Sequence, residues 1–252
     1  MQRLACLALL LLILLPTLAA AVEVTLTDDG IVSLRWEGWR HASRQVALSV
    51  KLPGVPVLED AELLALPGGG IMRATRYGQE KQGTLVTERL LPSGDGLEWE
   101  VTLEGTGITW SNPIELILFV PEKTFPRGWT AWGTPDLALE NHLHNPLARR
   151  PREARTLIYG GTSVVSSDAF SLPFVSLLAP SEGIGLSLLQ APSDLLRDMK
   201  LVSTTEGVTF VHERHRLEQG KPLTFHLRLI AHEADWRAGA RELVKRYPEY
   251  FE

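Results

Sequence analysis

The segment Leu97-Glu98-Trp99-Glu100-Val101-Thr102-Leu103-Glu104 alternates apolar and polar side chains at every position. Successive side chains of a β-strand point to opposite faces of the sheet, so a period of two predicts a strand with one buried and one solvated face. Residues 45–52 and 224–231 have the same alternation. Three other segments are apolar at consecutive positions, which predicts strands covered on both faces: residues 114–120, 174–178 and 184–189.

Turn signals separate these segments. Glycine-rich turns occur at residues 67–70, 93–96, 206–207 and 218–222. Roughly a dozen short strands at hairpin spacing, with almost no helix, predict an antiparallel β-sandwich. An immunoglobulin-like domain has fewer strands than this. We therefore expect an all-β chain that folds as a large double-sheet sandwich, or supersandwich. With no internal repeat or low-complexity linker, we assign residues 22–231 to this one domain.

The N-terminus has the pattern of a secretory signal peptide. Arg3 supplies a basic start, residues 4–15 are apolar, and Ala19-Ala20-Ala21 offers a small-residue cleavage site. We therefore predict that residues 1–21 are removed and that the protein is secreted or periplasmic, with no membrane attachment after cleavage; an uncleaved anchor is the alternative. Cys6 is the single cysteine, so the mature chain would have no disulfide, catalytic thiol or cysteine-bound metal.

The charge of the chain argues against nucleic acid as a partner. The formal net charge is −5, and removal of Arg3 with the signal peptide leaves −6. Phosphate binding needs clustered lysine and arginine. The short run Arg149-Arg150-Pro151-Arg152 lies among prolines and is typical of a solvated loop.

The last 21 residues, 232–252, follow a different period and predict an amphipathic helix that begins at His232. One helical stripe carries Trp236, Ala240, Leu243, Val244 and Tyr247. Pro248 ends the helix. Tyr250 and Phe251 are aromatic side chains that should pack on something. We therefore expect a linker helix that docks a following domain through Trp236, Tyr247, Tyr250 and Phe251.

Two tryptophans give the best indication of a ligand site. Trp129 and Trp132 lie in a long irregular segment, residues 121–155, that we expect to be a loop. Indole rings offer apolar faces for sugar C–H groups and an N–H donor. Arg127 and Asn141, with Asn145, could add hydrogen bonds, so we assign Trp129, Trp132, Arg127 and Asn141 to carbohydrate binding. The alternative is that these tryptophans pack the loop onto the sheet or against a neighbouring domain.

The sequence predicts no metal site and no cofactor. His212 and His215 would point to opposite faces of a strand, so they cannot share an ion. His142 and His144 could converge on zinc with Glu140, but paired loop histidines are usually polar surface. Glu98 and Glu100 share a strand face at a spacing compatible with glycosidase carboxylates, yet their alternation with a buried row indicates a solvated face. No motif for a nucleophile, a zinc helix or a phosphate loop occurs, and we predict no catalytic residue in this chain.

The C-terminal third resembles a known architecture. The resemblance rests on Phe170-Ser171-Leu172-Pro173-Phe174-Val175-Ser176-Leu177-Leu178, on Gly185-Leu186-Ser187-Leu188, on residues 210–217, and on the run from His232-Glu233-Ala234-Asp235-Trp236-Arg237 to Arg246-Tyr247-Pro248-Glu249-Tyr250-Phe251. Together these segments, in residues 160–252, resemble the N-terminal galactose-mutarotase-like sandwich of secreted glycoside-hydrolase-like proteins. In that family a linker helix leads into a (β/α)8 barrel, which holds the catalytic carboxylates.

Three functions are therefore open. The first is an accessory sandwich domain of an exported carbohydrate-active protein, which supports a sugar site and docks a catalytic barrel. The second is a stand-alone extracytoplasmic carbohydrate-binding or scaffold domain without catalysis. The third is a complete enzyme of mutarotase or lyase type, with a histidine and a carboxylate in the sandwich cleft, for which His142, His144 and His215 are the candidate histidines.

Overall fold

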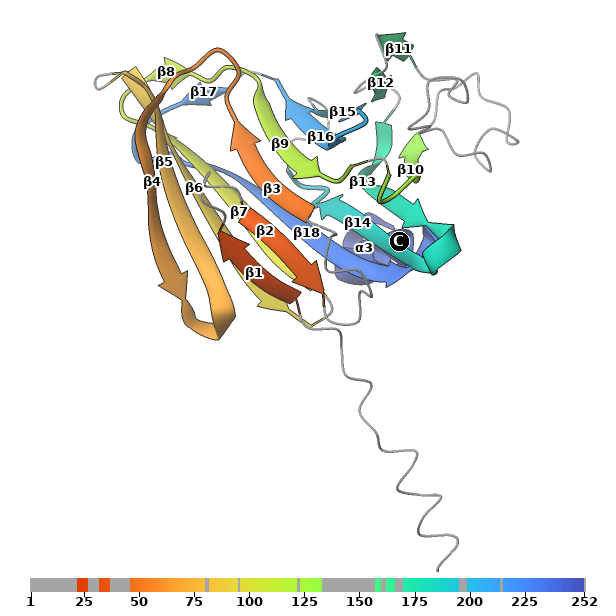
Figure 1. Ribbon diagram of the computed structural model, residues 1–252. Helices are drawn as coiled ribbons and strands as arrows, with labels where there is room; N and C mark the ends of the chain where they lie inside the picture. The colour runs from red at the N-terminus through yellow and green to blue at the C-terminus, as the bar shows by residue number, and fades with distance from the viewer. Residues whose placement is uncertain are drawn as a thin grey trace, which may run out of the picture.

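Two antiparallel sheets of eight strands face each other and form the body of the protein (Figure 1). The computed structural model describes residues 22–26, 32–36, 46–79, 82–94, 96–121, 123–132, 157–159, 162–165, 170–194, 199–213 and 215–251. In spatial order, sheet A contains β1 (Val22–Leu26), β2 (Val32–Trp36), β3 (Val46–Lys51), β9 (Ile114–Phe119), β16 (Gly207–His212), β15 (Met199–Ser203), β12 (Thr162–Val165) and β11 (Leu157–Tyr159).

Sheet B is the longer-stranded layer and carries the only α-helix among the described residues. In spatial order it contains β10 (Arg127–Trp132), β13 (Phe170–Ala179), β14 (Ile184–Gln190), β18 (Leu223–Glu233), β7 (Gly96–Gly105), β6 (Gln82–Ser93), β5 (Gly70–Gln79) and β4 (Val57–Leu66). A two-stranded ribbon of β8 (Thr109–Trp110) and β17 (Arg216–Leu217) forms a third, separate sheet that packs beside β6 and β7. The expected all-β, antiparallel sandwich with a C-terminal helix is confirmed.

The main core lies between the two sheets. In β7 the inward residues Leu97, Trp99, Val101 and Leu103 are fully buried, while the alternate side chains keep part of their surface exposed, as the sequence period predicts. The largest fully buried side chains facing this space are aromatic: Trp36, Trp99, Phe125, Phe210 and Phe225. Because no disulfide can connect the described parts of the sheets, this apolar layer must supply most of their cohesion.

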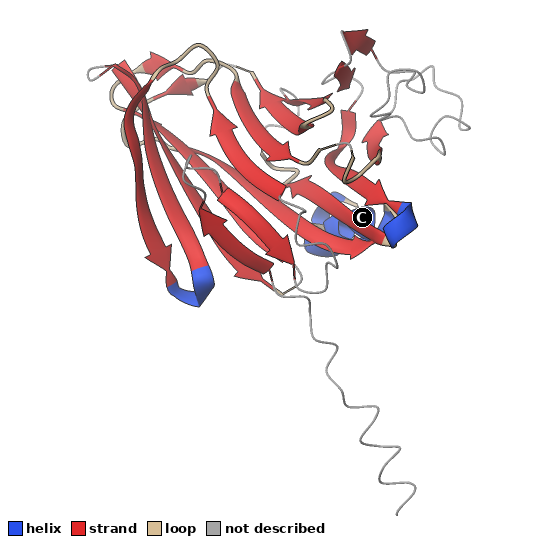
Figure 2. Cartoon of the chain, in the orientation of Figure 1, coloured by secondary structure: helices blue, strands red, loops and turns tan. Residues whose placement is uncertain are grey.

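The helix α3 (Arg237–Arg246) covers the outer face of sheet B and explains why β13 and β14 are apolar on both faces. Figure 2 shows it as the blue element behind the strands near the C-terminus. It begins at Arg237 and not at His232, because β18 continues its pairing with β14 through His232 and Glu233. Two short 3₁₀ turns, η1 (Pro67–Gly69) and η2 (Pro180–Glu182), close hairpins, and η4 (Pro248–Tyr250) follows the helix.

Two expectations about irregular segments are corrected. Trp129 and Trp132 lie on β10, which pairs with β13, and not in a loop; the strand forms because β13 offers backbone partners that local sequence does not reveal. Residues 210–217 form two strands and not one, because β16 ends at His212 and β17 begins at Arg216.

Several sequence predictions fall outside the described residues. These are the signal peptide at residues 1–21, Asn141, Asn145 and the pair His142 and His144. Within the described residues, no helix has both the length and the apolar character needed to cross a membrane.

Candidate functional site

The outer face of sheet B is covered by α3. The apolar stripe of the helix packs against it, through Trp236, Ala240, Leu243 and Tyr247. These side chains meet a second core formed by Trp129, Phe174, Leu189 and Ile230. The helix is therefore bound mainly to its own sandwich, and three of the four residues assigned to partner docking already pack against this second core: Trp236, Tyr247 and Phe251.

Trp129 is part of this second core. Its side chain is 7% exposed, and its ring stacks on Trp236 with centroids 3.8 Å apart and planes 14° apart. Phe174 contacts it at 5.4 Å in a tilted arrangement. The indole Nε1 is buried without a hydrogen-bond partner. In this arrangement the ring packs the helix onto the strand, which is the alternative interpretation of the tryptophan pair, and its stacking face is not open to a sugar.

The structure describes the other residues assigned to sugar binding only in part. Arg127 begins β10 and is exposed. Trp132 ends the same strand, with its backbone paired to Phe170 across a register shift, and its side chain is outside the described atoms. Asn141 lies outside the described residues. Their role in binding sugar stays a prediction.

An ion-pair network joins the helix to β7 and β18. Arg228 on β18 bonds Glu98 on β7 and also lies 3.1 Å from Glu242 of the helix, measured between Nε and Oε1. Arg246 near the helix end reaches the second oxygen of Glu98 at 2.8 Å. Glu98 is thus neutralised by two cations. Glu100, on the same face, pairs with Arg89 at 3.4 Å. Glu98 is therefore bound to structural partners, whereas the ion pair of Glu100 is exposed.

A buried hydroxyl pair lies beneath the helix. The Ser176 and Ser187 hydroxyls are 2.6 Å apart, and the Ser187 hydroxyl lies 2.7 Å from Nε2 of His232. Nδ1 of His232 lies 2.6 Å from the carbonyl oxygen of Glu233, so it must donate, which leaves Nε2 as the acceptor for Ser187. Burial lowers the pKa of His232. The Ser187–His232 hydrogen bond has the connectivity of a nucleophile and its base. Ser187 is fully buried under Gly239, however, so we assign this hydrogen bond a structural role.

A polar chain at the end of the sandwich connects the two sheets. His212 Nε2 lies 3.1 Å from Gln190 Oε1, and the Gln190 amide donates to the carbonyl of Asp194 at 2.7 Å. The Asp194 carboxylate lies 3.1 Å from Nδ1 of His226. Burial and the nearby His215 lower the pKa of His212 to about 3, so this ring is neutral at physiological pH. His226, with a 54% exposed side chain, is the accessible end of the chain.

This histidine–aspartate pair is the arrangement closest to acid–base chemistry in the described residues. A histidine hydrogen-bonded to a carboxylate can exchange a proton with a bound hydroxyl. Sequence reasoning missed it, because Asp194 and His226 lie on different elements and have no shared motif. Nowhere in the described part of the chain do three or more His, Cys, Asp or Glu side chains gather closely enough to hold a metal ion.

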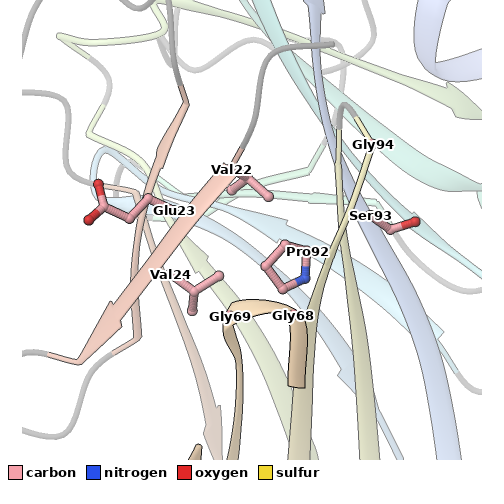
Figure 3. A pocket seen from close by; sticks show the side chains of 8 residues that line it. All are labelled: Val22, Glu23, Val24, Gly68, Gly69, Pro92, Ser93 and Gly94. Atoms are coloured by element: carbon pink, nitrogen blue, oxygen red, sulfur yellow. The ribbon is translucent and has the colours of Figure 1, made fainter. Parts of the chain in front are cut away.

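A shallow cleft with a volume of about 480 Å³ lies between strand β1 and two turns of sheet B (Figure 3). Strand β1 lies on one side of it, and the turns that link β4 to β5 and β6 to β7 lie on the other. Its lining is Val22, Glu23, Val24, Gly68, Gly69, Pro92, Ser93 and Gly94. Among these residues only Glu23 is charged, so the cleft lacks the convergent polar groups that orient a ligand.

No protein-family model matches the chain, and no curated protein is similar to it in sequence. Solved structures do match. The Slr1438 protein from Synechocystis sp. PCC 6803 superposes with a TM-score of 0.53 at 8% identity, over 86% of this chain and 93% of that one. A galactose mutarotase related enzyme from Lactobacillus acidophilus has a TM-score of 0.49 at 10% identity, over 86% and 96%. The GH36 α-galactosidase AgaA from Geobacillus stearothermophilus has a TM-score of 0.35 at 14% identity, over 86% and 30%.

The similarity to Slr1438 supports the large antiparallel sandwich. At such low sequence identity, this similarity supports the fold alone, because one fold is used for many unrelated functions.

Proposed function

We propose that this chain is a non-catalytic β-sandwich domain of an exported carbohydrate-active protein, and that it supports a sugar site and docks a catalytic domain. The proposal builds on the sandwich fold and on the resemblance of residues 160–252 to the sandwich and linker helix of glycoside-hydrolase-like proteins. The paired states of Glu98 and Glu100 favour a supporting role over a hydrolytic one, since each carboxylate is held by arginine.

The proposal that this domain docks a catalytic domain rests on the exposed apolar side chains of α3 and of the residues that follow it. The helix is fixed to sheet B by the Trp129–Trp236 stack and by the Arg228–Glu98 network. Val244 and Tyr250 nevertheless remain 44% and 50% exposed. A rigid element that presents uncovered apolar groups loses little conformational entropy when a partner covers them. We therefore place the contact with a catalytic domain at Val244 and Tyr250, beside the partly buried Phe251.

The sugar association is tested with purified residues 22–252. Affinity electrophoresis in gels that contain soluble starch, xylan, galactan or β-glucan should retard the protein in at least one gel. Reducing-sugar assays on the same polysaccharides should show no product. Absence of retardation in every gel would overturn the sugar association, and release of product by this chain would overturn the non-catalytic role.

The docking part is tested with a (β/α)8 barrel encoded in the same transcription unit. We expect the two purified proteins to associate in sedimentation velocity, and Val244→Ser with Tyr250→Ser to weaken that association roughly tenfold, as loss of two buried apolar contacts implies. Leu63→Ser on the exposed edge strand β4 is the matched control. If no such barrel is encoded, or if it does not associate, docking is excluded and a stand-alone binding domain remains.

A further inference from the structure

Among the tryptophans whose side chains the structure describes, one is exposed, and it is not Trp129. Trp110 on β8 is 59% exposed, and Ile108, two residues before it, is 67% exposed. Ile108 lies in the bend that leads into β8, and we call these two exposed apolar side chains the apolar ledge. Strand β8 is at the end of the sandwich that lies far from α3 and the C-terminus (Figure 1).

The ledge is rigidly supported. β8 pairs with β17, and Leu217 on β17 is fully buried in the main core. Next to this pair, the Ser111 backbone N–H donates to the carbonyl of His215 at 2.8 Å, and the His215 N–H donates to the Ser111 hydroxyl at 2.9 Å. The Trp110 ring is therefore carried on backbone that is fixed before any ligand arrives, which lowers the entropic cost of binding.

A cluster of charged side chains begins opposite Trp110, on β17 and the turn after it. Arg216 lies directly opposite Trp110 in the strand register, so both side chains share the outer face. Glu218 bonds Arg216 at 2.9 Å and Lys221 at 2.6 Å through its two oxygens. The three charged groups contact one another and retain N–H donors and carboxylate lone pairs next to Arg216, the residue opposite Trp110.

We propose that Trp110 and Ile108 form a stacking platform for a pyranose ring, and that Arg216, Glu218 and Lys221 bind the sugar hydroxyls. Sugar hydroxyls both donate and accept, so they suit a border that offers donors and acceptors together, and the C–H face of a pyranose matches one indole face. A protein partner fits less well, since a stable interface buries about 800 Å² on each side and two apolar side chains are a small core for it.

The platform proposal rests on the proposed sugar association and specifies the surface to which the sugar binds. It is separate from the docking tail, so one domain could hold a polysaccharide and a catalytic partner at the same time. Sequence reasoning missed Trp110 because it follows a glycine-containing turn, Gly105-Thr106-Gly107, outside any long alternating segment. That turn context, with Ser111-Asn112-Pro113 after it, is the signal that could have indicated an exposed ring.

The test compares Trp110→Ala with wild-type protein, both as residues 22–252, by calorimetric titration with the polysaccharide that retards the wild type. Because the ring is exposed, we expect an unchanged melting temperature and roughly a tenfold or greater loss of affinity. Trp110→Phe keeps a flat ring and should lose less. Leu63→Ala, which truncates an exposed apolar side chain on β4, is the matched control and should bind as the wild type does.

The outcomes separate the platform from the proposed function. Wild-type affinity in Trp110→Ala would overturn the platform and leave the sugar association standing. A variant that changes the association state in sedimentation but not the affinity for sugar would show that Trp110 is a protein contact, which also overturns the platform. Failure of the wild type to bind any of the polysaccharides would remove both.

Discussion

Trp236 lies flat on Trp129, with ring centroids 3.8 Å apart and planes inclined by 14°. One ring precedes the helix α3 and the other is on the edge strand β10, 107 positions earlier in the chain. The stack joins the first residues of the helix to the strand that borders sheet B. It therefore decides both where the helix lies and which tryptophan is unavailable to ligand.

We expect Trp129→Ala to lower the free energy of unfolding by about 3–5 kcal/mol, the usual cost of removing a buried aromatic side chain. The loss should appear in urea denaturation followed by circular dichroism. Trp110→Ala, at an exposed ring, is the control and should change stability by less than about 0.5 kcal/mol. Equal stability of the two variants would show that the stack does not hold the helix.

Gly239→Ala should loosen the helix. A Cβ at this position would lie 2.5 Å from the Ser187 hydroxyl oxygen and 2.9 Å from that of Ser176, both fully buried. Since neither hydroxyl can move into open space, we expect destabilisation of about 1–3 kcal/mol from overpacking, with faster amide hydrogen exchange in residues 237–246. Lys245→Ala on the exposed face of the same helix should leave exchange unchanged. Protection equal to that of the wild type in Gly239→Ala would contradict this packing.

The ion pair between Arg73 and Glu88 is buried, with Nη2 and Oε2 2.5 Å apart, and Trp99 Nε1 donates to the other Glu88 oxygen at 3.2 Å. Burial raises the pKa of Glu88, and Arg73 opposes that shift. Arg73→Met leaves the carboxylate without its cation and should cost about 3–5 kcal/mol at neutral pH. The double variant Arg73→Met with Glu88→Gln should recover much of that loss in urea denaturation. If the double variant is no more stable than the single one, the cost lies in packing and not in the uncompensated charge.

Acid should destabilise the protein through His212. Its pKa is lowered from 6.5 in the unfolded chain to about 3 in the folded one, by burial first and by His215 second. Above pH 6.5 both states hold a neutral ring, so His212 has no effect. Between pH 6.5 and about 3 only the unfolded state binds the proton, so stability falls by up to about 1.4 kcal/mol per pH unit from this group.

The measurement for His212 is the difference in unfolding free energy between wild type and His212→Gln from pH 7.5 to 4. The wild type should lose stability more steeply below pH 6.5 than His212→Gln does. Parallel curves for wild type and His212→Gln would mean that His212 becomes protonated without unfolding.

Much of the sandwich was predictable because strand periodicity is a local property. The alternation of Leu97, Trp99 and Val101 with Glu98 and Glu100 follows from the pleat alone, and each side chain lies on the expected face. The consecutive apolar positions of β14 likewise predicted cover on both faces, which α3 supplies. The helix start was misplaced because strand pairing of His232 with Gly185 cannot be seen from the helical stripe.

The candidate sites were less predictable, because they depend on which residues meet across the fold. Asp194 and His226 come together only because Gln190 and Leu227 pair in adjacent strands and bring the following turn beside β18. Local spacing contains no information on that pairing.

The sequence by itself determined the layered β architecture, the apolar stripe of the C-terminal helix and the lack of cysteine in residues 22–252. Only the tertiary structure decided that Trp129 is covered and Trp110 is open. The physical reason is that periodicity records which face of an element is apolar, whereas exposure depends on what packs against that face. Trp129 meets Trp236 from a helix far along the chain, while Trp110 lies on a two-stranded ribbon whose outer face no described element covers.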